Sequence, residues 1–81
     1  MKLTIVSPQH KHEYDVQWIE AQTPVGSIVI KSEHAPIILS LVAGSDFVFV
    51  LDSDEKKMIR LMRPAFLEVT RTSAMMLIGQ D

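Results

Sequence analysis

Short stretches of alternating hydrophobic and polar residues, separated by turn residues, run along the whole chain. Alternation with a period of two is typical of β-strands that bury one face, whereas an amphipathic helix repeats every three to four residues. The strand pattern occurs in residues 3–6, 14–21, 28–30, 37–42, 47–51, 57–62, 66–70 and 74–78. Short strands with turn signals between them are typical of sandwiches and barrels. We therefore expect an all-β fold, a small β-sandwich of about eight to ten short strands, in a single domain over residues 1–81.

Two of these segments depart from simple alternation. Val16 and Trp18 share one phase, whereas Ile19 and Ala21 follow the opposite one. A change of phase inside one strand predicts a β-bulge, which turns the side chains over. The pattern leaves two orientations open for Trp18, in the core or as an exposed anchor. Residues 47–51 are apolar at every position, which indicates a strand covered on both faces.

Residues 54–61 are the one segment that could instead be helical, because Met58 and Leu61 have helical spacing. The segment is too short to form a stable helix alone, and the polar turn at residues 52–55 favours a hairpin. Thioether side chains readily fill irregular gaps in a core. We therefore expect core and edge positions, rather than an adaptable binding surface, for Met58, Met62, Met75 and Met76.

Composition excludes several classes of function. The 81 residues carry a net charge of −2 with a pI near 5.8 and no basic cluster, so we expect no nucleic-acid partner. The chain has no cysteine, which excludes disulfides and thiolate metal sites. No apolar run approaches the ~20 residues of a spanning helix, and the first residues lack the pattern of a secretory signal. We therefore expect no direct membrane insertion, and any membrane association would go through a partner.

Residues that could carry chemistry are few. His10 and His12 would share one face of a strand, but a closed metal site needs about four ligands, so a solvated loop is the favoured interpretation. In Ser32-Glu33-His34, adjacent side chains of an extended chain point in opposite directions and cannot form a catalytic relay. A phosphate-binding loop is excluded because the glycines lie far apart, at Gly26, Gly44 and Gly79. We predict no catalytic, cofactor-binding or metal-binding residues and no small-molecule substrate.

Four short motifs follow one another along the chain. They are Leu3-Thr4-Ile5-Val6-Ser7-Pro8, then Gly26 with Ile28 and Ile30, then His34-Ala35-Pro36-Ile37-Ile38, and finally Phe66-Leu67-Glu68-Val69. In order and spacing they resemble the motifs "L-x-V-x-(S/T)-P", "EGEIGI", "HAPLL" and "FLEV" in the amino-terminal β-sandwich of the epsilon subunit of F-type ATP synthases. The resemblance covers essentially all 81 residues. It implies a β-sandwich of the same type.

The resemblance further implies a noncatalytic central-stalk (rotor) subunit of a proton-translocating F-type ATP synthase, without a cofactor and without enzymatic activity of its own. Such a subunit couples rotation of the membrane c-ring, through the gamma subunit, to the catalytic head. By resemblance, Ser7, His34 and Leu39 face gamma and Ser27 lies in the loop that faces the c-ring. The isolated chain is expected to be a monomer. In the complex it would be peripheral on the cytoplasmic face of the bacterial inner membrane.

The chain also departs from the family pattern. Prolines and glycines of the family are replaced at Val29, Ser32, Glu33, Pro64 and Ala65. Because glycine usually marks positive φ or a close backbone approach, we expect these loops to be built differently. The chain ends where the family's helical hairpin would begin, so we expect the family's braking function to be absent. The alternative interpretation is a divergent orphan β-sandwich that serves as a protein-interaction module.

Overall fold

The structure, a computed structural model, describes residues 1–79 and contains eight β-strands and no helix in that range. The strands are β1 (Lys2–Val6), β2 (Lys11–Thr23), β3 (Gly26–Lys31), β4 (Ile37–Leu41), β5 (Asp46–Leu51), β6 (Lys56–Arg60), β7 (Ala65–Val69) and β8 (Ser73–Ile78). The predicted all-β fold is confirmed. The alternative of a helix over residues 54–61 is wrong, because β6 pairs antiparallel with β5 along this segment.

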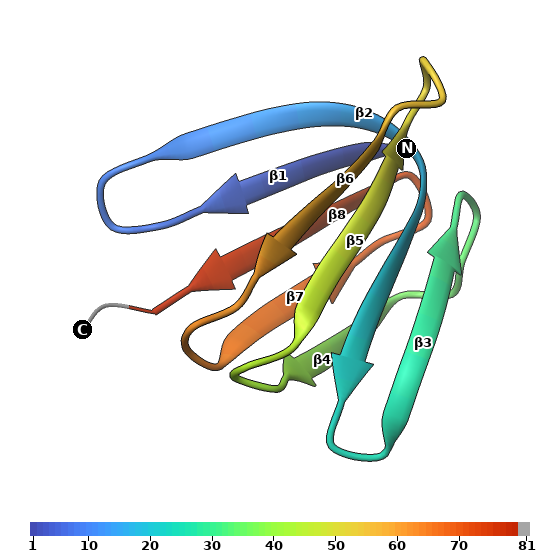
Figure 1. Cartoon of the computed structure of the whole chain (residues 1–81). Coiled ribbons are helices and arrows are strands. Elements are labelled where there is room, and N and C mark those ends of the chain that lie inside the picture. Colours follow the sequence, from blue (N-terminus) through green and yellow to red (C-terminus); the bar gives the residue numbers. More distant parts are fainter. Residues whose placement is uncertain (80–81) are drawn as a thin grey trace.

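The strands form one curled sheet in the order β4-β7-β8-β1-β2-β5-β6, with β3 also paired to β2. All neighbours are antiparallel except β1 and β8, which run parallel and join the two ends of the chain. The first half of β2 lies beside β1 and its second half beside β3, so that this strand curves across the molecule (Figure 1). The curl of the sheet brings the part formed by β4, β7, β8 and β1 opposite the part formed by β3, β2, β5 and β6. A backbone hydrogen bond of 3.1 Å, from the Val42 N–H to the Gln22 carbonyl, joins the two parts.

The curvature of β2 begins at the predicted bulge. Val16 pairs with Leu51 and Trp18 with Val50, so Gln17 is an extra residue in the ladder. The Gln17 side-chain amide donates instead to the Leu51 carbonyl at 3.1 Å. Val16 before the bulge and Ile19 after it are both buried, as the change of phase predicts. One strand thereby contributes to both parts of the curled sheet.

The core lies between the two parts and is entirely apolar among the described residues. Its largest fully buried side chains are Phe47, Phe49, Leu3, Ile19, Ile30, Leu41, Leu67 and Met76. The prediction that β5 is covered on both faces is confirmed, because Phe47 and Phe49 point into the core while Val48 and Val50 on the outer face are each only 9% exposed. Burial of apolar surface of this kind is the main stabilising contribution to folding.

The prediction of core and edge positions for the methionines is confirmed at Met76, which is fully buried, and at Met58 on the edge strand β6, and it is wrong at Met62, which lies in a turn. Met58 is 64% exposed and Met62 is 81% exposed. Met58 points outward because β6 alternates and Ile59 takes the inward position, and Met62 lies in the turn after β6. An apolar residue on an edge strand or in a turn thus need not be covered by a second layer.

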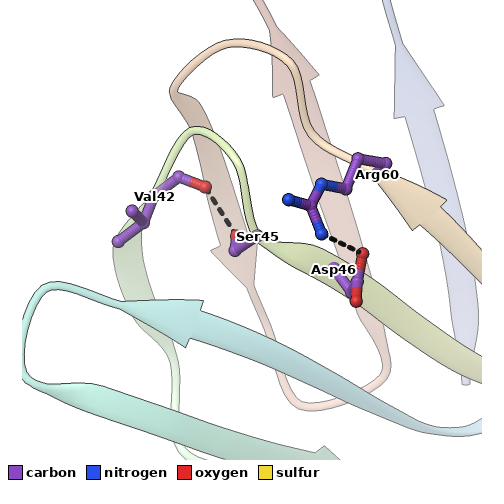
Figure 2. Close-up of polar contacts among 4 residues, drawn as sticks. All are labelled: Val42, Ser45, Asp46 and Arg60. Atoms are coloured by element: carbon purple, nitrogen blue, oxygen red, sulfur yellow. Dashed lines mark hydrogen bonds and ion pairs between the residues drawn. The ribbon is translucent and has the colours of Figure 1, made fainter.

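Polar contacts close the turn between β4 and β5 (Figure 2). The Ser45 hydroxyl donates to the Val42 carbonyl at 2.5 Å, and Gly44 takes a φ of 79°. Across the adjoining β5–β6 pair, the Arg60 guanidinium lies 3.3 Å from the Asp46 carboxylate. The turn therefore has the polar residues and the left-handed glycine expected of a tight reversal.

In the β3–β4 loop, Glu33 stands where the resemblance places a family glycine, and the expectation that this loop is built differently stays a prediction. This residue takes a φ of 69°, a left-handed conformation that glycine adopts without cost. Its N–H donates to the Arg71 carbonyl at 2.7 Å and ties the loop to the β7–β8 turn. A glutamate therefore holds a backbone conformation that suits glycine, at an energetic cost of about 1–2 kcal/mol.

Candidate functional site

The most prominent surface feature is an apolar area on the outside of β4, β7, β8 and β1. We call it the β7–β8 face and define it by five residues: Val6, Ile38, Phe66, Met75 and Leu77. Phe66 pairs with Leu77 across β7 and β8, and Leu77 pairs with Val6 across β8 and β1. Ile38 and Met75 belong to the neighbouring row, where Glu68 lies between them. The face is therefore continuous over four strands.

Strand alternation explains why these side chains are outside. Leu67, Val69, Ala74 and Met76 occupy the inward positions of β7 and β8 and are buried. The intervening positions must point outward, and two of them carry large apolar groups: Phe66 is 56% and Leu77 43% exposed. Ile38 points outward from β4 in the same way and is 71% exposed. Contiguous exposed apolar surface in a soluble domain usually marks a protein-interaction site. This face is the candidate functional site.

Two ion pairs border the β7–β8 face on the β1–β2 hairpin. The Glu13 carboxylate lies 2.8 Å from the Lys2 ammonium and 3.7 Å from that of Lys11. The hydrogen bond and charge of Lys2 lower the pKa of Glu13, and the same contact raises the pKa of Lys2. All three side chains are solvent-exposed, so these pairs define a charged rim and add little to stability.

The three residues expected to face gamma do not gather in one place. Ser7 follows β1 at the end of the sheet where Val6 pairs with Leu77, and its N–H donates to the His10 carbonyl at 2.9 Å. His34 precedes β4 at the other end, where Ile37 pairs with Val69. Leu39 lies between them on β4, but it occupies the inward phase and packs against the core. Ser7 and His34 thus flank the β7–β8 face, whereas the Leu39 side chain lies on the opposite, inner side of the sheet.

Ser27 lies elsewhere, on the β2–β3 hairpin. It is exposed on β3 and pairs with Gln22, two residues from the hairpin tip. The Thr23 hydroxyl donates to the Gly26 carbonyl at 2.8 Å and accepts from the Val25 N–H at 3.3 Å, which fixes the turn. Val25 at the tip is 97% exposed. This tip therefore presents an apolar side chain and a hydroxyl on a rigid turn.

The possible chemical sites are not supported by their geometry. His10 and His12 do share a face, with ring centroids 6.0 Å apart, but no cluster of three or more metal-ligating residues occurs within residues 1–79. The His34 ring nitrogen Nδ1 lies 2.7 Å from the Ala35 carbonyl, which can only accept a hydrogen bond. That contact holds the ring at the corner before β4 and leaves it without a hydroxyl or carboxylate partner in the described part of the chain.

The sequence contained a signal for the β7–β8 face that strand prediction alone does not exploit. Apolar residues occupy consecutive positions at Ile37-Ile38 and at Met75-Met76-Leu77. In a strand, consecutive residues lie on opposite faces, so one of each pair must be outside unless a further layer covers it. The signal indicates a second apolar face, but not whether the domain itself covers it.

Comparison with known proteins gives a clear result for the fold. A chain from the central stalk and c-ring structure of the Tetrahymena thermophila mitochondrial ATP synthase superposes with a TM-score of 0.77 over 99% of this chain, at 13% identity. A chain of the Euglena gracilis mitochondrial ATP synthase, in an OSCP/F1/c-ring structure, gives a TM-score of 0.77 over 94% of this chain, at 16% identity.

This chain spans 63% and 48% of the length of those two chains. No family model matches the sequence, and no curated protein matches it. Within residues 1–79 no helix is long and apolar enough to cross a membrane. At these identities the likeness establishes a shared fold: the curled β-sandwich of this chain is one that also occurs in chains of mitochondrial ATP synthases.

Proposed function

We propose that the chain is a noncatalytic central-stalk subunit of a proton-translocating rotary ATP synthase, of the epsilon type. The observation that carries the proposal is the superposition of nearly the whole chain on a chain from a central-stalk and c-ring structure. The ordered motifs from Leu3 to Val69 support it independently, because they resemble the epsilon subunit in sequence. No cofactor or substrate is needed for this function.

In this proposal the gamma subunit packs on the β7–β8 face, with Ser7 and His34 at its two ends. Exposed Phe66, Leu77 and Ile38 would supply the apolar contact area, and Glu68 in the middle would meet a cation or a hydrogen-bond donor of gamma. The β2–β3 hairpin, with Ser27, would rest on the c-ring. Eight paired strands around an apolar core make a stiff body, so rotation of the ring would be passed to gamma without chemical change in this subunit.

The proposed location follows from the partners. The chain would be peripheral to the membrane and held there by the c-ring, on the cytoplasmic face of the bacterial inner membrane as the resemblance implies. The two similar solved chains come from mitochondrial complexes, so the bacterial location rests on the resemblance in sequence alone.

A second candidate is a divergent β-sandwich that binds a different protein through the same face. Two observations favour it: the identity to the similar chains is only 13% and 16%, and Leu39 packs inward and so presents little surface to gamma. Both candidates require a protein partner on the β7–β8 face, and they differ in which protein it is.

Binding to gamma decides between them. The chain and the gamma subunit of the same organism are co-expressed, and their affinity is measured by titration calorimetry. We expect a stable complex that Phe66→Ser and Leu77→Ser each weaken at least tenfold, because each removes an exposed apolar contact at the centre of the face. Met62→Ser is the matched control, since Met62 is 81% exposed and lies outside this face. A wild-type chain that does not bind gamma would overturn the stalk assignment and favour the second candidate.

A further inference from the structure

The strand β3 has a neighbour on one side only. It pairs with the second half of β2 and with no other strand of residues 1–79, and it lies at one margin of the molecule (Figure 1). An edge strand presents a row of unpaired backbone N–H and C=O groups, which natural proteins usually block with charged residues or proline. The edge strand β6 carries Lys56, Lys57 and Arg60 among its five residues. Residues 27–30 of β3 contain neither a charge nor a proline, so this edge is open.

Two hydrogen bonds show which backbone groups of β3 point away from β2. In an antiparallel pair, residues that bond to the neighbouring strand alternate with residues whose N–H and C=O point the other way. The Lys31 carbonyl accepts from the His34 N–H at 3.2 Å. The Gln22 carbonyl, which lies opposite Ser27, accepts from the Val42 N–H at 3.1 Å. Neither carbonyl therefore bonds across the β2–β3 pair, and every second residue from 27 to 31 directs its backbone groups to the open edge.

The side chains along this edge are mostly apolar. Val29 lies at the middle of the edge and is 51% exposed. Ile28 faces inward and packs against the core cluster, but it is only partly buried. The one charge of β3 is Lys31, which is exposed and has no ion pair within residues 1–79. The edge therefore offers free backbone hydrogen-bonding groups, an apolar centre and one cation.

We propose that β3 binds an extended segment of another polypeptide as an added antiparallel strand along residues 27–31. Unpaired strand groups of this kind are satisfied by a further strand, which bonds first to the N–H and C=O of Val29 and then to those of Ser27. β-Branched residues of the segment cover Val29 and Ile28, because such side chains pack well across paired strands. A carboxylate of the segment lies opposite Lys31. A second copy of β3 does not supply this carboxylate, because residues 26–31 contain no acid.

The inference goes beyond the proposed function and does not rest on it. The added strand uses the backbone of β3, whereas the contact proposed for gamma lies on the β7–β8 face, in the other part of the curled sheet. The tip of the β2–β3 hairpin, at residues 23–26, also stays free. Loss of binding at one of these surfaces therefore leaves the other testable.

The test uses a short synthetic peptide with β-branched residues opposite Val29 and Ile28 and a glutamate opposite Lys31. A second peptide has the same side chains but is N-methylated at the residue opposite Val29, so that it cannot donate to the Val29 carbonyl. Binding is followed by the emission of Trp18, the only tryptophan of the chain, which pairs with Lys31. We expect saturable binding of the first peptide and affinity about tenfold lower for the second, because one hydrogen bond is lost.

Amide hydrogen exchange tests the edge directly. In the free chain, the Ser27 and Val29 amides should exchange much faster than those of Ile28 and Ile30, which bond to β2. The first peptide should slow the exchange of Ser27 and Val29, and the N-methylated peptide should have much less effect. Slow exchange of Ser27 and Val29 in the free chain would overturn the inference, because their N–H groups would then already have partners.

Variants of β3 make the inference specific. Val29→Pro removes the outward N–H and leaves the bonds to β2 in place, because proline is tolerated where the N–H faces away from the sheet. This variant should bind the first peptide about tenfold more weakly or worse, whereas the control Val29→Thr keeps the N–H and the branched side chain and should bind within about threefold of wild type. Lys31→Glu should prefer a peptide with lysine opposite position 31, and Lys56→Glu on the other edge should bind as wild type does.

Three results would overturn the inference: a wild-type chain that binds neither peptide, an affinity that N-methylation leaves unchanged, or a Lys31→Glu variant that keeps the wild-type preference. If Val29→Pro does not fold, the N-methylated peptide still tests the same hydrogen bonds on the wild-type chain. A concentration-dependent dimer in which the Val29 amide is protected would also overturn it and would assign the edge to a second copy of the chain.

Discussion

Two adjacent residues of β7 test the strand orientation on which the β7–β8 face depends. Leu67 is fully buried between Leu39 and Met76, whereas Phe66 beside it is 56% exposed on the outer face. A buried leucine truncated to alanine costs about 2–5 kcal/mol, and a fully buried phenylalanine about 3–5 kcal/mol. Less than half of Phe66 is buried, so the same change there should cost roughly 1–2 kcal/mol. The smaller residue is therefore expected to matter more.

The difference is large on the scale of the whole domain. Stabilities of roughly 0.05–0.15 kcal/mol per residue give about 4–12 kcal/mol for a chain of 81 residues. Leu67→Ala should remove a large part of this, and Phe66→Ala only a small part. Urea unfolding followed by circular dichroism measures both, and equal slopes in the two variants would show that only stability has changed. A greater loss for Phe66→Ala would refute the strand orientation, since a one-residue slip exchanges the two faces of β7.

Three further predictions concern single positions. Glu33→Gly should stabilise the domain by about 0.5–1 kcal/mol in urea unfolding. The left-handed backbone costs glutamate about 1–2 kcal/mol, and the greater freedom of glycine in the unfolded chain offsets part of that gain. The control is Ser32→Gly, which should destabilise the domain slightly because the φ of Ser32 is not positive. The Lys2–Glu13 pair should stabilise the fold at neutral pH: its contribution is lost as pH falls through the lowered pKa of Glu13, below 4.5, and again as pH rises through the raised pKa of Lys2, above 10.5. Glu13→Gln should therefore flatten the acid limb of a stability profile, and an unchanged limb would contradict the assignment. His34→Ala should weaken gamma binding while changing the free energy of unfolding by no more than roughly 1 kcal/mol, since the ring is half-exposed; a variant that unfolds but binds normally once refolded would make His34 a core residue.

The strands were predictable because each follows a local rule. The bulge at Gln17 follows from the change of phase between Val16 and Ile19, and the double burial of β5 follows from its uninterrupted apolar run. Both patterns are set by side chains a few residues apart. Met58 and Met62 were not predictable in this way, because alternation says which residues share a face but not whether a second layer covers that face.

The pairing of the strands is less accessible to local patterns. Nothing in the residues of β1 and β8 indicates that they run parallel, because this contact joins the two ends of the chain. The same limit applies to the candidate site. Ser7 and His34 were identified through the resemblance, and both flank the β7–β8 face. Phe66 and Leu77 lie at the centre of this face, but their sequence pattern predicts only that they belong to strands. Leu39 is partly buried and packs against the core, because β4 points its side chain to the same side as the buried Leu41. That Leu39 faces gamma stays a prediction.

The parallel β1–β8 pair has a consequence for how the chain reaches this structure in the cell. Leu3 pairs with Ala74, so the strand β1 has one of its two neighbours about 70 residues away. Contacts between such distant residues form late, because a long loop must close before they contribute free energy. During synthesis β1 can therefore pair with β2 early, but it lacks its second neighbour, β8, until residues 73–78 leave the ribosome. The outer β7–β8 face, which needs β1 and β8 side by side, can then bind a partner only after β8 has been synthesised.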